Sequence, residues 1–334
     1  MGTASTRTLS TSPVCLALTW SLGAVWACAS LAGCGPDKDV LLSPPPDMNI
    51  EAPAECTLQG IVYDTTPAPT VTPDAGADPR PYFSFFATSQ AGLYALPAGL
   101  HAPAPDPALG YGGDFGGLAG ADEICSMLAA RSNPGDTKVW RAFLSSPGAA
   151  GEARVDAIGR VGPGPWYDYN GVLLARNVQG LLPNAAGRPS GAQAPLGSMF
   201  SDENGEDIRP PGQDNHDTLT GSNSCGRLYD DGASGSVGTC AGWTSKSVHG
   251  REGNLAGVGG QVPVGHSWPR GFSIGSDQAL GARWMSDHTI NGCEPGFEVY
   301  GGAGAPAGDF RVGAGGGFGG IYCFALGATA PGGS

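Results

Sequence analysis

The stretch GGLAGADEICSMLAARSNPGDTKVWRAFLSS, residues 116 to 146, decides the fold of this chain. Its first half predicts a short helix, because Ile124 and Leu128 fall one turn apart on a face that includes or adjoins Cys125. Residues 139 to 145 carry apolar side chains on both sides of their alternation, which predicts a strand covered on both faces. The stretch therefore joins a cysteine-bearing helix to a buried strand.

Two acids in this stretch invite a functional interpretation. Asp122 and Glu123 have the chemistry of acid-base residues, but the positive end of a helix dipole also favours acids at a helix start. We expect that structural role for both. The sequence Asn133-Pro134-Gly135 is expected to end the helix.

Composition limits the kind of protein. The 57 Gly and 29 Pro among 334 residues indicate much turn and loop, so one compact domain with an extended segment fits better than two domains. The net charge is -13, and 17 Lys and Arg leave few groups to neutralise phosphates. Nucleic acid is therefore not expected as a partner, and neither is an anionic membrane surface.

Residues 1 to 33 are expected to form a signal peptide, because Arg7 precedes an apolar run from Val14 to Ala32 that ends in small residues. The sequence Leu31-Ala32-Gly33-Cys34 resembles the lipobox of bacterial lipoproteins, in which the cysteine is acylated (palmitate) and begins the mature chain. A plain secretory signal and an uncleaved membrane anchor are the alternatives. Gly35 stands where Asp favours inner-membrane retention, so the resemblance implies an outer-membrane lipoprotein, on the periplasmic or surface face.

The rest of the chain divides into a spacer, a domain and a tail. Residues 34 to 80 are rich in Pro, Asp and Ala and cannot bury enough apolar area to fold alone. Within this spacer, residues 56 to 63 have strand-like character and are expected to dock on the domain. The domain is expected over residues 81 to 328, beginning with a strand in YFSFFATSQ, and residues 329 to 334 form a tail.

Six cysteines remain after Cys15, Cys28 and Cys34 are assigned to the signal and the lipid. An even set in an oxidising compartment predicts disulfides, although six cysteines allow fifteen pairings. The chain has no CxxC, HxxxH or HxH spacing, so the usual zinc patterns are missing. The six are Cys56, Cys125, Cys225, Cys240, Cys293 and Cys323.

The order GxxGAD, Cys125 and WRAFLSS resembles endostatin, the C-terminal fragment of a basement-membrane collagen, and the related C-type-lectin-like domains of bacterial exported proteins. Leu219-Thr-Gly-Ser222, Cys240-Ala-Gly-Trp243 and the closing segment Ile321-Tyr-Cys-Phe324 extend the resemblance over residues 82 to 326. It implies an α+β, C-type-lectin-like fold with a mixed twisted sheet, one or two short helices and long disulfide-tied loops.

The same resemblance implies the disulfide pairing. In that family pattern Cys125 joins Cys323 and Cys240 joins Cys293, which leaves Cys56 and Cys225 as the third pair. Cys240 also lies in a sequence that imitates a nucleophile elbow, but no strand-to-helix turn is expected around it. A disulfide is therefore the better interpretation, and no catalytic residue is assigned.

A group of acids supplies the candidate metal site. Calcium takes six to eight oxygen ligands, and this segment offers several, but Asn204-Gly205 is also a strong hairpin-turn dipeptide. A solvated turn without any cofactor is the favoured interpretation, with calcium as the alternative. The candidate ligands are Asp202, Asn204, Glu206 and Asp207. The five histidines are scattered through Gly- and Pro-rich loops and suggest no triad.

Candidate ligand-binding residues are Trp268, Trp284 and His266, which could form a sugar-stacking surface if the tryptophans are exposed. A core position is the alternative for either tryptophan. The expected function is non-enzymatic recognition of a glycan or a protein at the cell envelope. The alternatives are a structural or adhesion lipoprotein without a small ligand and an envelope hydrolase.

Overall fold

The structure of the chain is a computed structural model. It describes residues 56, 58–61, 82–148, 153–184, 187–192, 200–208, 215–229, 237–247, 262–268, 283–297 and 309–326. These residues all belong to one compact unit, Lys38–Ser334. The expected signal peptide, Cys34, most of the expected spacer and the expected tail lie outside the described residues. None of the helices in the described part reaches the length and apolar character that a membrane crossing requires.

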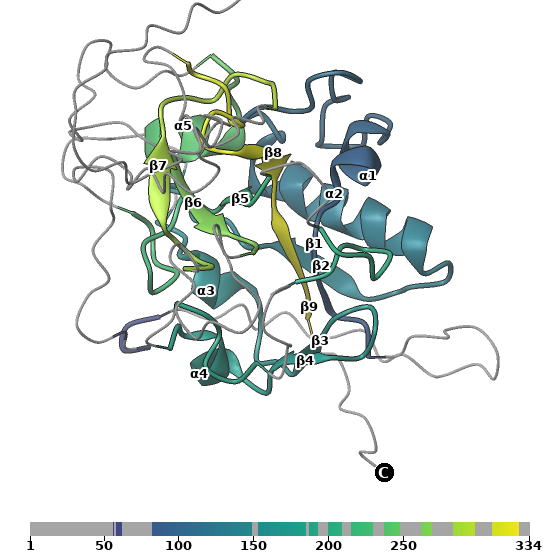
Figure 1. The fold of residues 1–334 in the computed structure, drawn as a ribbon, viewed down its shortest axis with the longest axis vertical. Coiled ribbons are helices and arrows are strands. Elements are labelled where there is room, and N and C mark those ends of the chain that lie inside the picture. The colour runs from purple at the N-terminus through teal and green to yellow at the C-terminus, as the bar shows by residue number, and fades with distance from the viewer. Residues whose placement is uncertain are drawn as a thin grey trace, which may run out of the picture. The chain divides into compact units, whose positions relative to one another are not determined.

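Short strands and helices are interspersed along the first part of the chain, and four strands, β6 to β9, end it (Figure 1). The helices are α1 (Gln90–Tyr94), α2 (Gly117–Ser132), α3 (Ala157–Arg160), α4 (Val178–Leu181) and α5 (Cys240–Trp243), with a 3₁₀ turn at Val237–Thr239. The strands are β1 (Phe85–Ala87), β2 (Val139–Ala142), β3 (Trp166–Tyr167), β4 (Leu173–Ala175), β5 (Asp217–Leu219), β6 (Val262–His266), β7 (His288–Ile290), β8 (Gly317–Gly320) and β9 (Tyr322–Leu326).

The expected cysteine-bearing helix is α2. It buries Ile124, Cys125 and Leu128, and it ends where the sequence predicted, with Asn133 as its C-terminal cap. Its start was wrongly predicted. The helix begins at Gly117, after Gly116 in a left-handed conformation that glycine adopts without steric cost, and its first turn contains no acid. Asp122 and Glu123 therefore lie beyond the first turn and have other partners.

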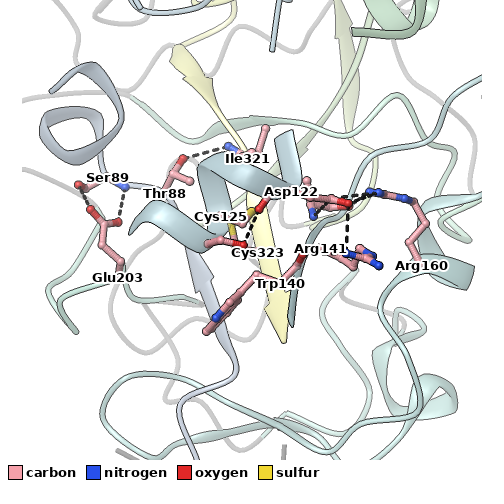
Figure 2. Close-up of a disulfide and its surroundings, with 12 residues drawn as sticks. Thr88, Ser89, Asp122, Cys125, Trp140, Arg141, Arg160, Glu203, Ile321 and Cys323 are labelled. Carbon is pink, nitrogen blue, oxygen red and sulfur yellow. Dashed lines mark hydrogen bonds and ion pairs between the residues drawn. A yellow bond between two sulfur atoms is a disulfide. The ribbon is translucent and has the colours of Figure 1, made fainter. Parts of the chain in front are cut away.

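The first sheet has the order β1-β9-β2, with β9 in the centre and antiparallel to both neighbours. Cys323 on β9 lies opposite Phe86 on one side and Ala142 on the other. A disulfide joins this cysteine to Cys125 of α2, which packs across β2 (Figures 1 and 2). The aromatic residues of β1 and β2 fill the space beneath the helix, as in the contact of Phe86 with Trp140 at a ring distance of 5.1 Å.

The second sheet is mixed and has the order β7-β6-β5-β8. The β5–β6 and β6–β7 pairs are antiparallel, whereas β5 and β8 run parallel. A single residue, Ile321, separates β8 from β9, so one segment of chain connects the two sheets. The strands β3 and β4 form a separate antiparallel pair.

The α+β class expected from the sequence is confirmed, because the described residues contain few helices, several sheets and three disulfides. Two details differ. The strands divide among three sheets instead of one, and four very short helices accompany the longer α2. The Gly-rich and Pro-rich connections between elements explain both differences, since such residues interrupt strands and helices after a few positions.

The disulfides join Cys125 to Cys323, Cys240 to Cys293 and Cys56 to Cys225. The first two are the pairs that the family resemblance implied, and the third is the pair that remained by elimination. The third bond holds the end of the spacer on the domain. Beside it, Leu58 and Ile61 pack against the second hydrophobic cluster, a group of buried side chains that includes Phe143, Trp284 and Phe324. The carbonyl oxygen of Gln59 also accepts a hydrogen bond from Arg227. The expected docking of this segment is thus confirmed for its described residues.

Candidate metal centre

Three histidines and one aspartate meet at one end of the second sheet. Asp217 begins β5, His266 ends β6, and His288 begins β7. His216 comes directly before Asp217. Among the described residues, this is the one group of at least three His, Cys, Asp or Glu side chains whose potential ligand atoms converge, all within 4.8 Å of one another.

The strand register explains why these residues meet. His266 lies opposite Asp217 across the β5–β6 pair, and His288 lies opposite Val264 across the β6–β7 pair. Residues directly opposite in an antiparallel pair share a face, and so do residues two apart on one strand. Asp217, His266 and His288 therefore project from the same face of the sheet.

His216 reaches the group from a position just outside the regular strand. Its carbonyl oxygen accepts hydrogen bonds from the backbone nitrogen and the hydroxyl of Ser267, at 2.8 and 3.0 Å. These bonds fix the backbone of His216 against the end of β6. The ring then lies edge-on to His266, with 4.2 Å between the ring centroids.

One carboxylate oxygen is the centre of the arrangement. The Nε2 atoms of His216, His266 and His288 lie 3.1, 3.3 and 3.0 Å from Oδ1 of Asp217. The side chains are almost closed to solvent, with exposed fractions of 0, 3 and 10% for the histidines in that order and 1% for Asp217. Three imidazole rings thus surround one buried negative charge.

The electrostatics follow from burial and from these short distances. Burial alone would raise the pKa of Asp217, but the charges on His288 and His216 and the hydrogen bonds from the rings hold it well below its usual range. Burial likewise opposes a charge on His288, yet the Asp217 carboxylate raises the pKa of that ring to about 9. The centre therefore keeps its carboxylate ionised and requires a positive charge beside it.

The other nitrogen of His288 helps to define the arrangement. Its Nδ1 lies 3.3 Å from the carbonyl oxygen of Thr289. A carbonyl oxygen only accepts, so Nδ1 carries a hydrogen and Nε2 is directed to the carboxylate. A neutral ring in this state would place its Nε2 lone pair against an anionic oxygen, which is favourable only if a proton or a metal ion lies between them.

The three distances to Oδ1 of Asp217 match those expected around a tetrahedral metal ion, and the four potential ligand atoms all lie within 4.8 Å of one another. Zinc binds imidazole nitrogen and carboxylate oxygen at about 2.0–2.1 Å, so ligand atoms in a regular tetrahedron are about 3.3 Å apart. The three N–O separations of 3.0, 3.1 and 3.3 Å are close to that value. Three nitrogen ligands do not suit calcium or magnesium, which prefer oxygen, whereas they suit zinc and its neighbours among the transition metals.

Two further residues border the centre. Oδ2 of Asp287 lies 3.4 Å from Nε2 of His266, so a second carboxylate faces the same ring. Trp268 lies edge-on to His216, with 5.5 Å between the ring centroids. This tryptophan is buried, and it forms part of the wall around the centre instead of an exposed surface.

The expected aromatic ligand surface is not formed by the two tryptophans named from the sequence. Trp284 is fully buried in the second hydrophobic cluster, and its indole nitrogen donates to the carbonyl oxygen of Leu181 at 3.1 Å. Trp268 is 8% exposed. Both belong to the interior because a domain with few large aliphatic residues uses its aromatic residues to fill the core. The third residue named with them, His266, lies in the candidate metal centre.

The candidate calcium segment forms a turn closed by a bridge between Ser201 and Asp207. Oδ1 of Asp202 accepts the backbone N–H groups of Asn204 and Glu206, at 2.8 and 3.0 Å. This carboxylate therefore holds the turn together, and the carboxylates of this segment do not converge as a ligand group within the described residues.

The sequence did not reveal the roles of His216, Asp217 and His288. Metal ligands are recognised in sequence by close spacing, and these residues belong to strands that are far apart along the chain. Each histidine of the centre does stand in or beside a short run with β-branched residues, in HDTLT, VPVGH and HTI. That shared context was the one available signal, and it becomes informative only when the strand pairing is known.

Comparison with models of known protein families gives no match for this chain, and comparison with curated proteins gives none either.

Proposed function

We propose that this protein is a non-enzymatic metal-binding domain of the bacterial envelope, and that its centre holds one divalent transition-metal ion, with zinc preferred. The observation that carries the proposal is the convergence of three histidine Nε2 atoms on one buried Asp217 oxygen at 3.0–3.3 Å. A buried carboxylate needs a compensating cation, and three imidazoles with one carboxylate form a complete ligand set for zinc.

The envelope location rests on two kinds of support. The protein has three disulfides. Disulfides persist in oxidising compartments and are rare in the cytosol. The Leu31-Ala32-Gly33-Cys34 sequence resembles a lipobox, so we propose lipid attachment at Cys34 and an outer-membrane location. The C-type-lectin-like fold remains part of the same proposal, supported by the bond that ties α2 to the closing strand β9.

One observation favours a structural or adhesion role over glycan recognition through an aromatic surface. A sugar-stacking site needs exposed rings, but Trp268 and Trp284 are both buried. We therefore propose that any glycan or protein ligand binds elsewhere on the domain. The proposed metal ion then has a structural role and stabilises the fold of the lipoprotein's domain.

The test is metal stoichiometry and affinity. The full chain is purified with its disulfides intact, and any free thiol is alkylated so that it cannot bind metal. We expect one zinc per chain by elemental analysis. Isothermal titration of the chelator-treated protein should show affinity that falls more than about 100-fold in His266→Ala and in Asp217→Asn, since even residues that only orient ligands contribute 10- to 100-fold.

His101→Ala is the matched control, because His101 is an exposed histidine on a surface loop outside the centre. Its zinc affinity should equal that of the wild type. Non-reducing peptide mapping verifies that each variant keeps the three native disulfides. Absence of zinc from the folded wild type, or equal affinity in all variants, would refute the proposed function.

A further inference from the structure

We infer that the centre is closed: four protein ligands complete the coordination of the ion, and the glycine-rich segment Gly313–Gly317 fills the space where a fifth ligand or a water molecule would enter. The inference rests on the proposed function, since it concerns the same ion. It adds the class of the site, which is structural instead of catalytic, and it assigns a role to glycines that the fold alone does not explain.

Gly315 provides the main evidence. A β-carbon at this position would lie 2.1 Å from Oδ2 of Asp217 and 2.7 Å from Cε1 of His288. The backbone of residue 315 therefore sits directly against two of the four proposed ligands. A methyl group does not fit between this backbone and the ligands, so a water molecule, which is of similar size, does not fit there either.

Gly316 and Gly317 hold that backbone in place. The Asp217 N–H donates to the carbonyl oxygen of Gly316 at 3.0 Å, and a β-carbon on Gly317 would lie 2.9 Å from Cβ of Asp217. The contact continues as the parallel pairing of β5 with β8. The segment is thus fixed to the same strand that supplies the carboxylate.

The remaining sides are also occupied. The rings of His216 and His266 stand edge-on at 4.2 Å, Trp268 lies edge-on to His216 at 5.5 Å, and Oδ2 of Asp287 lies 3.4 Å from Nε2 of His266. Side chains and backbone therefore enclose the centre on every side for which the described residues give a contact.

A closed site has a definite chemical meaning. Structural zinc sites have four protein ligands, whereas catalytic sites keep one position open for a water molecule or a substrate. An ion enclosed here cannot activate water, but it can hold β5, β6 and β7 together at one end of the sheet. The tight enclosure also disfavours ions that require six ligands, such as magnesium.

Cobalt(II) substitution tests the inference on the full chain. Four-coordinate cobalt(II) gives intense visible absorption bands, while five- and six-coordinate forms absorb weakly. We expect intense bands that do not change when azide is added up to a large excess. Weak bands, or a spectrum that azide shifts, would overturn the closed site while leaving metal binding intact. If no cobalt or zinc binds, the proposed function itself fails, so the two failures are distinct.

Gly315→Ala tests the role of the glycine segment. The added methyl must displace Asp217 or His288, so zinc affinity should fall at least about tenfold. Gly180→Ala is the matched control, because its methyl would meet the Ala175 β-carbon at 3.3 Å and lies on α4, which supplies no ligand. Unchanged zinc affinity in Gly315→Ala would contradict the inference. If this variant does not fold, the cobalt spectrum of the wild type still decides.

Discussion

The surroundings of Glu203, a buried carboxylate, change its pKa. Its two oxygens accept hydrogen bonds from the backbone nitrogen and the hydroxyl of Ser89, at 2.8 and 2.5 Å. Figure 2 shows this pair beside the Cys125–Cys323 bond. Burial raises the pKa of Glu203 above its ordinary value of 4.5, with the Ser89 bonds opposing the rise and the charge of Asp202 adding to it.

The raised pKa predicts the direction of a pH effect. A carboxyl group that binds its proton more tightly in the folded state stabilises the fold fully below its unfolded pKa, and this contribution is lost as pH rises through the folded pKa. The free energy of unfolding of the wild type, relative to Glu203→Gln, should therefore fall from pH 4 toward neutral pH. Urea denaturation at several pH values measures this difference, and a constant difference would contradict the assignment.

At the scale of elements, α2 is connected to its neighbours by more than its disulfide. Oδ1 of Asp122 accepts the N–H of Ala142 on β2 at 2.9 Å, and its carboxylate pairs with Arg160 of α3 at 2.8 Å and with Arg141 at 3.5 Å (Figure 2). One side chain thus joins α2, β2 and α3. This is the role of the acid that the sequence placed at the helix start.

Asp122→Ala should destabilise the protein by about 3 kcal/mol, because it removes the carboxylate from the largely buried Arg160 guanidinium, which then keeps only the Ala142 carbonyl oxygen, and leaves the Ala142 N–H without its acceptor. Urea denaturation measures the loss. The control is Glu206→Ala, which removes an exposed acid and should change the free energy of unfolding by less than about 0.5 kcal/mol. An equal effect of the two substitutions would show that the network contributes little.

The elements also show what a sequence can reveal. The end of α2, the α+β class and a disulfide framework were predictable, because local turn residues, periodicity and cysteine count carry that information. The start of α2 was not, since Gly116 and Gly117 resemble a loop until the left-handed cap is known. The metal centre depends on which strands pair and in which register, and those non-local choices leave no fixed spacing in the sequence.

For the whole molecule, the proposed ion stabilises one sheet more than the other. The β7-β6-β5-β8 sheet contains the centre, whereas the β1-β9-β2 sheet is held by the Cys125–Cys323 bond. In the described part, the two sheets are connected by short chain segments such as Ile321 and by hydrogen bonds such as the one from the Ser145 N–H to the carbonyl oxygen of Thr220 at 2.9 Å. Metal loss should therefore affect them unequally.

Removing the metal with a chelator should lower the melting temperature by about 10 °C. An ion at 1,000 times its Kd contributes about 4 kcal/mol, and each kcal/mol shifts the melting temperature of a domain of this size by about 2–4 °C. Hydrogen exchange should accelerate at Thr218, Val264 and Thr289 but remain slow at Phe86 and Phe324. Equal acceleration in both sheets, or in neither, would contradict this localised role. Magnesium added in place of zinc should not restore the melting temperature.

The bond between Cys56 and Cys225 determines where mechanical load enters the domain. With the proposed lipid at Cys34, the chain from the anchor meets the domain at Cys56, and this length of chain spans at most roughly 75 Å. The Cys56–Cys225 bond closes a covalent loop over residues 56 to 225, so the residues between Cys56 and β1 add nothing to that reach. A force applied at the anchor is therefore transmitted directly to the turn at Cys225 and bypasses the first strand. Reduction of this one bond would lengthen the segment between the anchor and the domain, and it would move the point of load to β1.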